Sequence, residues 1–136
     1  MHVRRGPQLV EVFAPAKLNL FLEVLGKRPD GFHEIETVMT RVSLYDTLTL
    51  ADDPSGAIAL ENDLSADSLP PAGQAAAADR TLPSGSANIV VRAIEALRQA
   101  AGVRHGARVR LVKRIPMAAG MAGGSTDAAA AILAAN

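Results

Sequence analysis

The feature that most constrains this chain is its last stretch, residues 115–136, which reads IPMAAGMAGGSTDAAAAILAAN. A glycine-rich segment, residues 120–124, runs directly into an alanine-rich segment with high helix propensity. Ser125, Thr126 and Asp127 lie between them, and these residue types commonly cap the start of a helix. A glycine loop before a helix presents free backbone N–H groups and the positive end of the helix dipole to an anion. The pattern therefore predicts a phosphate-binding loop followed by a helix.

The same segment is also consistent with a flexible loop before an ordinary helix. Two well-known phosphate loops are excluded by their motifs. It is not a Walker A loop, because no Lys-Ser or Lys-Thr follows the last glycine. It is not a G-x-G-x-x-G loop, because Gly120 and the pair Gly123-Gly124 have the wrong spacing. The residues alone leave open a phosphate loop of another kind and a plain connection.

Composition places the chain among globular proteins of one domain's length. It has 136 residues, of which 49% are hydrophobic, but only three Phe and one Tyr, so its core must be aliphatic. The formal net charge is zero and no run of Lys and Arg is longer than a pair. These features argue against a nucleic-acid-binding surface and against a basic membrane-binding patch. The lack of cysteine excludes a disulfide framework and a thiolate metal site.

Neither a signal peptide nor a membrane span is predicted. The basic start, MHVRR, is not followed by an apolar run, because Glu11, Pro15 and Lys17 interrupt it. No apolar run approaches the length of a membrane span. We therefore expect a cytoplasmic protein. The chain ends at Asn136, inside the alanine-rich segment, so we also expect it to be the N-terminal part of a longer protein.

Strands are predicted in the first half of the chain. Leu9–Phe13 forms a short strand that Pro15 interrupts, and Lys17–Val24 alternates cleanly with its leucines and Val24 toward the core. Further strands are expected at Glu34–Leu44, and then at Thr47–Leu50 and Ala57–Leu60, with a turn at residues 52–56. These segments predict a run of antiparallel strands.

The second half is predicted to hold a surface loop, a helix and a strand. Residues 63–85 lack an apolar period and form the loop. Ser86 or Asn88 caps a helix over Ile89–Ala101, which Gly102 ends. The strand over Gly106–Lys113 turns Ala107, Val109 and Leu111 to the core. The face of the helix predicted to be buried consists of Ile89, Ala93, Ile94, Leu97 and Ala100.

Some charged residues are interpreted as solvated or structural residues without a functional role. Lys113 and Arg114 form a solvated pair at the end of a strand, and Tyr45 and Asp46 are structural. The acidic residues at positions 52, 53, 63 and 67 match no calcium loop, so they are solvated loop residues. The three histidines have no zinc-ligand spacing, and we predict no metal ligand on this chain.

Three motifs carry a family resemblance. The pattern P-x-x-x-G-[LM]-[AG]-G-[SG]-[ST] at residues 116–125 resembles the ATP loop of the GHMP kinases. Residues 14–20, APAKLNL, match the first signature of these kinases throughout. Residues 28–33, RPDGFH, resemble a signature of one branch, the 4-diphosphocytidyl-2-C-methyl-D-erythritol kinases. The chain departs from the pattern at Ala122, where glycine is usual, and at Phe32, where tyrosine is commoner. Alanine at position 122 requires a negative φ or mild strain.

The resemblance implies roles for residues that the chain alone leaves ambiguous. Lys17 becomes the catalytic residue, although composition favours a solvated strand lysine. Asn19 lies with Lys17 at the acceptor hydroxyl, and Phe32 and His33 hold the cytosine base, although a plain hairpin turn is the alternative. Asn88 lies by the adenine ring, which is compatible with helix capping. The implied ATP-binding residues are Asn88, Pro116, Gly120, Met121, Ala122, Gly123, Gly124, Ser125 and Thr126.

The resemblance also implies a fold and a reaction. The fold is α+β, an incomplete GHMP-kinase N-terminal domain over residues 1–136, with a mostly antiparallel sheet and helices packed on one side. The expected reaction uses ATP and Mg²⁺ to phosphorylate the 2-hydroxyl of a small molecule, 4-diphosphocytidyl-2-C-methyl-D-erythritol, with no nucleic-acid or membrane partner. The family's catalytic aspartate lies in a G-x-D-x-P motif that these residues lack, and Asp127 is not that residue. We therefore expect little kinase activity from this chain alone.

Two alternatives remain at this point. The chain could derive from another GHMP kinase, such as a mevalonate-type kinase, although the Asp30–His33 segment argues against it. It could instead be a non-catalytic nucleotide-binding fragment.

Overall fold

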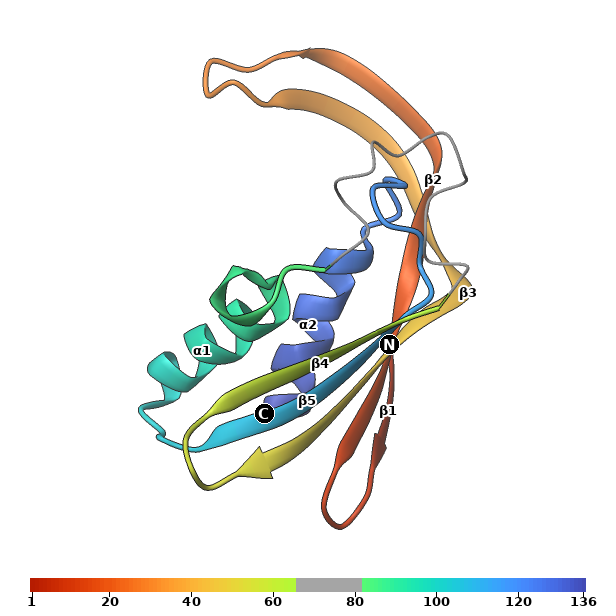
Figure 1. Ribbon diagram of the computed structural model, residues 1–136. Helices are drawn as coiled ribbons and strands as arrows, with labels where there is room; N and C mark the ends of the chain where they lie inside the picture. Colours follow the sequence, from red (N-terminus) through yellow and green to blue (C-terminus); the bar gives the residue numbers. More distant parts are fainter. Residues whose placement is uncertain (66–81) are drawn as a thin grey trace.

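The computed structural model describes residues 1–65 and 82–136, which form a five-stranded sheet with helices on one face (Figure 1). The strand order is β1-β2-β3-β5-β4. The neighbouring pairs β1–β2, β2–β3 and β3–β5 are antiparallel, and β4–β5 is parallel. The strands are β1 (His2–Arg5), β2 (Val10–Lys27), β3 (His33–Asp53), β4 (Ile58–Leu64) and β5 (Gly106–Lys113). This is the predicted α+β fold with a mostly antiparallel sheet.

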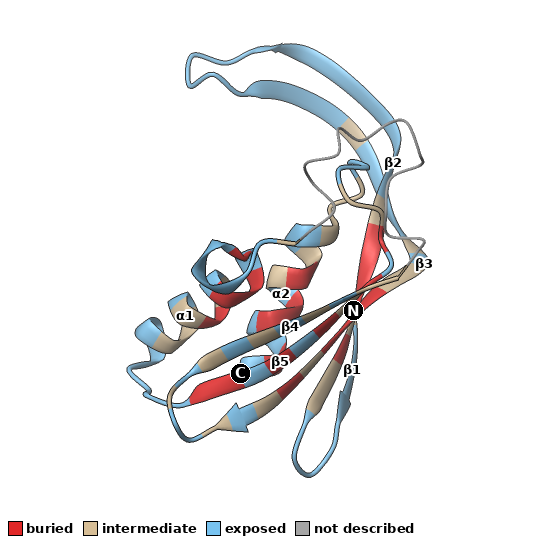
Figure 2. Cartoon of the chain, viewed as in Figure 1, coloured by how far each residue is buried: buried red, intermediate tan, exposed pale blue. Residues whose placement is uncertain are grey.

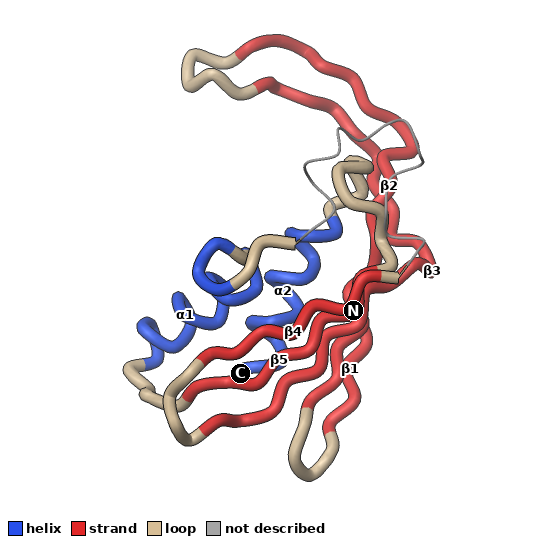
Figure 3. Tube along the Cα trace, in the orientation of Figure 1, coloured by secondary structure: helices blue, strands red, loops and turns tan. Residues whose placement is uncertain are grey.

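Two helices, α1 (Ile89–Ala101) and α2 (Gly123–Ala135), cover the same face of the sheet (Figures 1 and 3). A short 3-10 helix, η2 (Gly85–Ala87), precedes α1. The predicted bounds of α1 are confirmed. Asn88 is its N-cap, and Gly102 ends it with a left-handed φ of 67°. Each of the two α-helices has 13 residues, and within the described part of the chain no helix has the length and apolar character to cross a bilayer.

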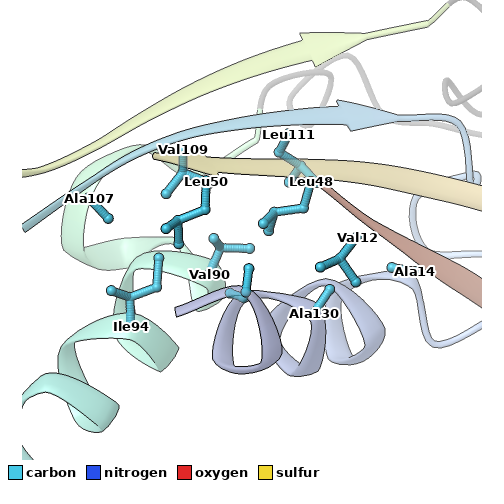
Figure 4. Close-up of a cluster of buried hydrophobic side chains, with 12 residues drawn as sticks. Val12, Ala14, Leu48, Leu50, Val90, Ile94, Ala107, Val109, Leu111 and Ala130 are labelled. Atoms are coloured by element: carbon cyan, nitrogen blue, oxygen red, sulfur yellow. The ribbon is translucent and has the colours of Figure 1, made fainter. Parts of the chain in front are cut away.

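The core lies between the two helices and the central strands (Figure 4). It is aliphatic, as composition predicted, and its largest fully buried apolar residues include Leu48 on β3 and Leu111 on β5. The predicted inward residues of β5 are confirmed as buried. The cluster consists of Val12, Ala14, Leu48, Leu50, Val90, Ile94, Ala107, Val109, Leu111, Ala130, Ala131 and Ala134.

The buried face of α1 differs from the prediction. Val90, Val91 and Ile94 are buried, whereas Ile89 is 44% exposed. The predicted and observed stripes share Ile94 and lie next to each other around the helix, so a period of 3.6 fits both and does not decide between them. The stripe with the two valines packs against the sheet instead.

Beyond the helices, β2 and β3 continue as a two-stranded antiparallel ribbon, here called the arm (residues 18–40). In Figure 1 the arm curves away from the sheet toward the side of the helices, and Figure 2 shows its surface as almost entirely exposed. Leu20 is 67% exposed and Met39 61% exposed. The prediction that Leu18, Leu20, Leu22 and Val24 face the core is therefore wrong. No described element covers the arm, and shifts of register at Asn19/Phe21 and Val24/Gly26 interrupt its alternation.

Strand boundaries also differ from the predictions. Pro15 does not interrupt a strand but lies inside β2, next to a shift of register between Pro15 and Lys17. The pairing of β2 with β1 ends at Phe13, so β2 has one partner at Pro15, where a strand tolerates proline. The two segments predicted at 34–44 and 47–50 form the single strand β3.

The short strand predicted at 57–60 is longer than expected and pairs in parallel with β5, because α1 returns the chain beside it. The predicted loop at 63–85 begins inside β4 and ends at the first residue of η2, and its central part lies outside the described residues.

Candidate functional site

The glycine loop lies in the connection between β5 and α2. Helix α2 begins at Gly123, with Ala122 as its N-cap and no side-chain cap, so the prediction that the Ser-Thr-Asp segment caps this helix is wrong. The Ser-Thr-Asp segment lies in the first turns of the helix instead, after the glycine pair. A glycine pair can begin a helix when other contacts fix the loop before it. The hydroxyl of Thr126 donates to the carbonyl oxygens of Ala122 and Gly123, at 3.2 and 2.9 Å.

The start of α2 presents the donors that an anion site needs. The N–H of Thr126 donates to the carbonyl of Ala122 at 3.0 Å, so the N–H groups of Gly123, Gly124 and Ser125 precede the first bond of the helix. Gly124 and Ser125 are exposed, and open space surrounds the position of a Cβ at Gly120. This arrangement fits a phosphate group by the chemistry of its donors.

Two alanines in this loop have left-handed backbones. Ala118 and Ala122 both have φ of 59°, and Gly120 has φ of 70°. The sequence left open either a negative φ or mild strain at Ala122, and the structure has the strained conformation. A residue with a Cβ costs about 1–2 kcal/mol in this conformation, so the loop geometry is held against a local preference.

The first signature lies beside the glycine loop. The backbone N–H of Lys17 on β2 donates to the carbonyl oxygen of Met121 at 3.0 Å. The Nζ of Lys17 donates to the Oδ1 of Asn19 at 3.3 Å, so both predicted acceptor-side residues point to one side of β2. Ala14 and Ala16 are fully buried, which fixes this part of the strand in the core. The structure thus brings Lys17, Asn19 and the loop together.

The cytosine-binding candidates lie at a different place, at the tip of the arm. Phe32 is 72% exposed, and its N–H donates to the Oδ1 of Asp30 at 3.1 Å within the hairpin turn. His33 pairs with Lys27 in the ladder. Lys27 is ten positions along β2 from Lys17, a path of roughly 30 Å at strand spacing. Phe32 and His33 therefore do not contact the glycine loop in this structure.

Asn88 is buried, and both ends of its side chain have protein partners. Its Oδ1 accepts from the N–H of Val90 at 2.9 Å, and its Nδ2 donates to the carbonyl of Pro83 at 2.8 Å. The helix-capping role is confirmed. The adenine-side role stays a prediction.

A buried charge cluster lies directly beneath the glycine loop, and the sequence reasoning missed it. Lys113, predicted as solvated, is almost fully buried; its Nζ donates to the Oδ2 of Asp127 at 2.8 Å and to a carboxylate oxygen of Asp46. The Oδ1 of Asp46 accepts from the N–H groups of Arg114 and Ile115, at 2.6 and 2.9 Å. A polar side chain at an inward position of a strand was the signal that could have revealed the cluster. We define it as Asp46, Lys113 and Asp127.

The cluster contains two carboxyl groups for one ammonium group, and burial perturbs them. Burial raises the pKa of Asp127 to about 7; the Lys113 ammonium opposes this rise and the Asp46 carboxylate adds to it. Burial alone lowers the pKa of Lys113, but its two carboxylate partners outweigh burial and raise it. The Oδ1 of Asp127 is buried and has no hydrogen-bond partner among residues 1–65 and 82–136. Burial therefore favours the neutral form of Asp127 more strongly than that of an exposed aspartate.

Three of the acidic residues predicted as solvated, at positions 52, 53 and 63, are paired with basic neighbours, and Asp67 lies outside the described residues. Asp52 lies 3.0 Å from the Nδ1 of His105, and Asp63 lies 2.9 Å from Arg110. Within residues 1–65 and 82–136, no group of three or more His, Asp or Glu side chains has the arrangement of a metal site.

Comparison with known proteins shows what this sequence and fold resemble. A family profile described as GHMP kinases N terminal domain matches residues 88–136. A 4-diphosphocytidyl-2-C-methyl-D-erythritol kinase from Pelotomaculum thermopropionicum is 47% identical over 128 residues, covering 94% of this chain and 39% of the relative. The same-named enzyme of Symbiobacterium thermophilum is 48% identical, covering 88% and 37%. The chain thus spans little more than a third of the curated relatives it matches.

Two solved structures show the same fold. A 4-(cytidine 5'-diphospho)-2C-methyl-D-erythritol kinase aligns with a TM-score of 0.59 at 36% identity, over 90% of this chain and 38% of that one. Homoserine kinase from Cytophaga hutchinsonii aligns with a TM-score of 0.65 at 15% identity, over 98% and 36%, which supports the fold alone.

The sheet, the two helices and the glycine loop at α2 resemble the N-terminal domain of the GHMP kinases, whose profile matches residues 88–136. The chain is similar in sequence to part of the 4-diphosphocytidyl-2-C-methyl-D-erythritol kinases.

Proposed function

We propose that this chain is the nucleotide-binding part of an enzyme that transfers the γ-phosphate of ATP to the 2-hydroxyl of 4-diphosphocytidyl-2-C-methyl-D-erythritol, in the non-mevalonate route to isopentenyl diphosphate. The observation that carries the proposal is the hydrogen bond between the N–H of Lys17 and the carbonyl of Met121. It joins the first signature to the glycine loop, so a phosphate bound at the loop lies beside the strand that presents Lys17 and Asn19. The names of the relatives supply the acceptor.

The chemistry required of these residues is positioning and charge stabilisation. The N–H groups of Gly123, Gly124 and Ser125 would hold phosphate oxygens. The ammonium group of Lys17 would offset the charge that develops on the transferred phosphoryl group. Mg²⁺ neutralises phosphate charge when ATP is bound, and we assign no ligand for it on this chain. At the arm tip, the ring of Phe32 is free to stack on a base and His33 to bind a base edge.

Nucleotide binding is the first test, and one site separates a specific loop from a non-specific anion surface. Ser125→Asp places a carboxylate at the exposed start of α2, where it favours the helix but repels a phosphate. We expect Mg-ATP affinity, measured by calorimetry, to fall at least about tenfold, since a like charge close to a bound phosphate costs about 1.4 kcal/mol or more. The neutral control Ser125→Asn should change affinity by less than about threefold. Equal affinity in both variants would place the nucleotide elsewhere.

The role of Lys17 is tested by turnover in the whole protein. Lys17→Ala should lower kcat about a hundredfold or more while changing KM little, because its charge matters most in the transition state. The control Arg108→Ala removes an exposed cation from β5, paired with Asp53 on the sheet, and should leave kcat unchanged. An unchanged kcat in the lysine variant would remove Lys17 from the catalytic residues.

The acceptor is tested at the arm tip. CDP should compete with the acceptor and mevalonate should not, which separates this activity from that of a mevalonate-type kinase. Phe32→Ala should weaken CDP binding about tenfold by loss of stacking, whereas Phe32→Tyr keeps the ring and should bind CDP as the wild type does. Competition by mevalonate instead would favour the other GHMP kinases.

The 136-residue chain alone should bind Mg-ATP and turn over little substrate, because no G-x-D-x-P motif supplies a catalytic carboxylate. Binding without turnover is also what a non-catalytic nucleotide-binding module would show. The two are separated by restoring the longer sequence of the relatives, which should restore turnover only to the kinase. Strong turnover by the short chain would contradict this assignment of the base.

A further inference from the structure

The buried cluster Asp46–Lys113–Asp127 ties together both ends of the glycine loop. Before the loop, Asp46 accepts from the N–H groups of Arg114 and Ile115. After it, Asp127 lies one helical turn beyond Gly123, the first residue of α2. The Nζ of Lys113 lies so close beneath Gly123 that a Cβ there would be 2.9 Å from it. Any change in the geometry of the cluster therefore moves the residues that flank the loop on both sides.

The charge of the cluster is unbalanced. With every group ionised, two carboxylates face one ammonium group, and the buried net charge is −1. With Asp127 protonated, the net charge is zero. Where two carboxyl groups lie in one buried site, one of them is commonly neutral, because both cannot ionise cheaply. The Oδ1 of Asp127 accepts no hydrogen bond from the described residues, so nothing there stabilises the ionised form of that oxygen.

The other charged groups near α2 do not balance this charge. On β2, Lys17 is engaged with Asn19. On α1, Glu95 is engaged with Arg98 and Gln99, and Arg92 is exposed. The guanidinium group of Arg114 is engaged with the hydroxyl of Thr47 and the carbonyl of Tyr45. Among the described residues, the charged groups that act on Asp127 are therefore Lys113 from β5 and Asp46 from β3. The rise in the pKa of Asp127 to about 7 is consistent with this geometry.

We propose that the cluster positions the glycine loop in a proton-dependent way, so that a nucleotide's phosphates bind more tightly when Asp127 is protonated than when it is ionised. This inference rests on the proposed nucleotide site. The reason is electrostatic and structural. A buried charge of −1 beneath the first turn of α2 repels a triphosphate bound above it. The two carboxylates also repel each other within the cluster that fixes the ends of the loop. The direct consequence is that nucleotide binding takes up a proton.

Asp127→Asn is the decisive variant. Its side-chain oxygen can still accept from Lys113, and its amide can donate to Asp46, so it resembles the protonated cluster at every pH. We expect the Kd of the wild-type chain for Mg-ATP to rise at least about fivefold from about pH 6 to about pH 8, relative to the change in Asp127→Asn. The variant is its own control for titration of the nucleotide, which affects both proteins alike.

The outcomes separate this inference from the function on which it rests. Binding by both proteins with the same pH dependence would overturn the proton linkage and leave the nucleotide site intact. No binding of Mg-ATP by the wild type at either pH would overturn both. If Asp127→Asn does not fold, carbon-13 NMR of the Asp127 carboxyl in the wild type decides. Saturating Mg-ATP should raise its titration midpoint by about one pH unit or more, the shift that corresponds to the fivefold change in Kd, and an unmoved midpoint would refute the linkage.

Discussion

The arm and the body of this domain are made of the same two strands, yet their surroundings differ completely. In the body, β2 and β3 are buried around Val12–Ala16 and Asp46–Leu50, under α1 and α2 (Figure 2). In the arm, residues of equal hydrophobicity such as Leu20 and Val38 are more than half exposed. The difference shows that an alternating apolar strand sequence specifies a strand, but not whether another element covers it.

The two regions also carry different parts of the proposed function. The body fixes the glycine loop through a buried, fully enclosed charge cluster. The arm carries the candidate base-binding residues on a ribbon held only by its own ladder. We therefore expect substitutions in the body to change stability and phosphate binding together, and substitutions in the arm to change acceptor binding alone. The following predictions test that division, beginning with the largest effect.

Lys113→Met should destabilise the domain most. It leaves two carboxyl groups buried without their cation, and breaking such a buried pair costs about 3–5 kcal/mol. Urea unfolding followed by circular dichroism measures the free energy of unfolding. The control Arg110→Met removes an exposed cation paired with Asp63 and should cost at most about 1 kcal/mol. A cost below 1 kcal/mol for both variants would mean that the cluster does not hold the body together.

Leucine truncation compares the two regions directly. Leu48→Ala removes a fully buried side chain and should cost about 2–5 kcal/mol of unfolding free energy. Leu20→Ala, in the arm, removes a side chain that is 67% exposed and should cost about 0.5 kcal/mol or less. Similar losses at both positions, measured in the same urea series, would show that the arm is covered in solution.

Adjacent glycines at the start of α2 provide a finer comparison. Gly123→Ala brings a Cβ to within 2.9 Å of the Lys113 Nζ and 3.2 Å of Ile115, so the helix start must shift, at a cost of about 1–3 kcal/mol. Gly124→Ala meets nothing closer than 3.9 Å and should stabilise the helix by up to about 1 kcal/mol. Thermal unfolding of the two variants should therefore shift in opposite directions. Shifts of the same sign would contradict the close packing of Gly123 on the cluster.

How far the sequence predicted this molecule depends on the range of the interaction involved. Helix α1, its cap at Asn88 and strand β5 were predicted with their bounds, because local propensity and capping determine them. The glycine loop and its neighbour Lys17 were found from short motifs. The solvent exposure of the arm was not predicted, since period-two alternation cannot report what lies opposite a strand.

The buried cluster escaped prediction for a similar reason. Asp46 and Lys113 are 67 positions apart, and each looks like an ordinary polar residue at a strand end. Their pairing depends on the register between β3 and β5 and on the position of α2, neither of which local sequence determines. Only Lys113 carried a hint, as an odd-numbered residue in phase with the buried Ala107, Val109 and Leu111.

The smallest expected effect concerns the strained loop itself. Ala122 has φ of 59°, a conformation that costs a residue with a Cβ about 1–2 kcal/mol and costs glycine almost nothing. Ala122→Gly also adds about 0.5–1 kcal/mol of chain entropy to the unfolded state, so the net gain should be about 0.5 kcal/mol. The control Ala128→Gly, inside α2, should lose about 1 kcal/mol. If both variants lose stability equally, then Ala122 is not strained in solution, and the body holds its loop without the local cost inferred from this geometry.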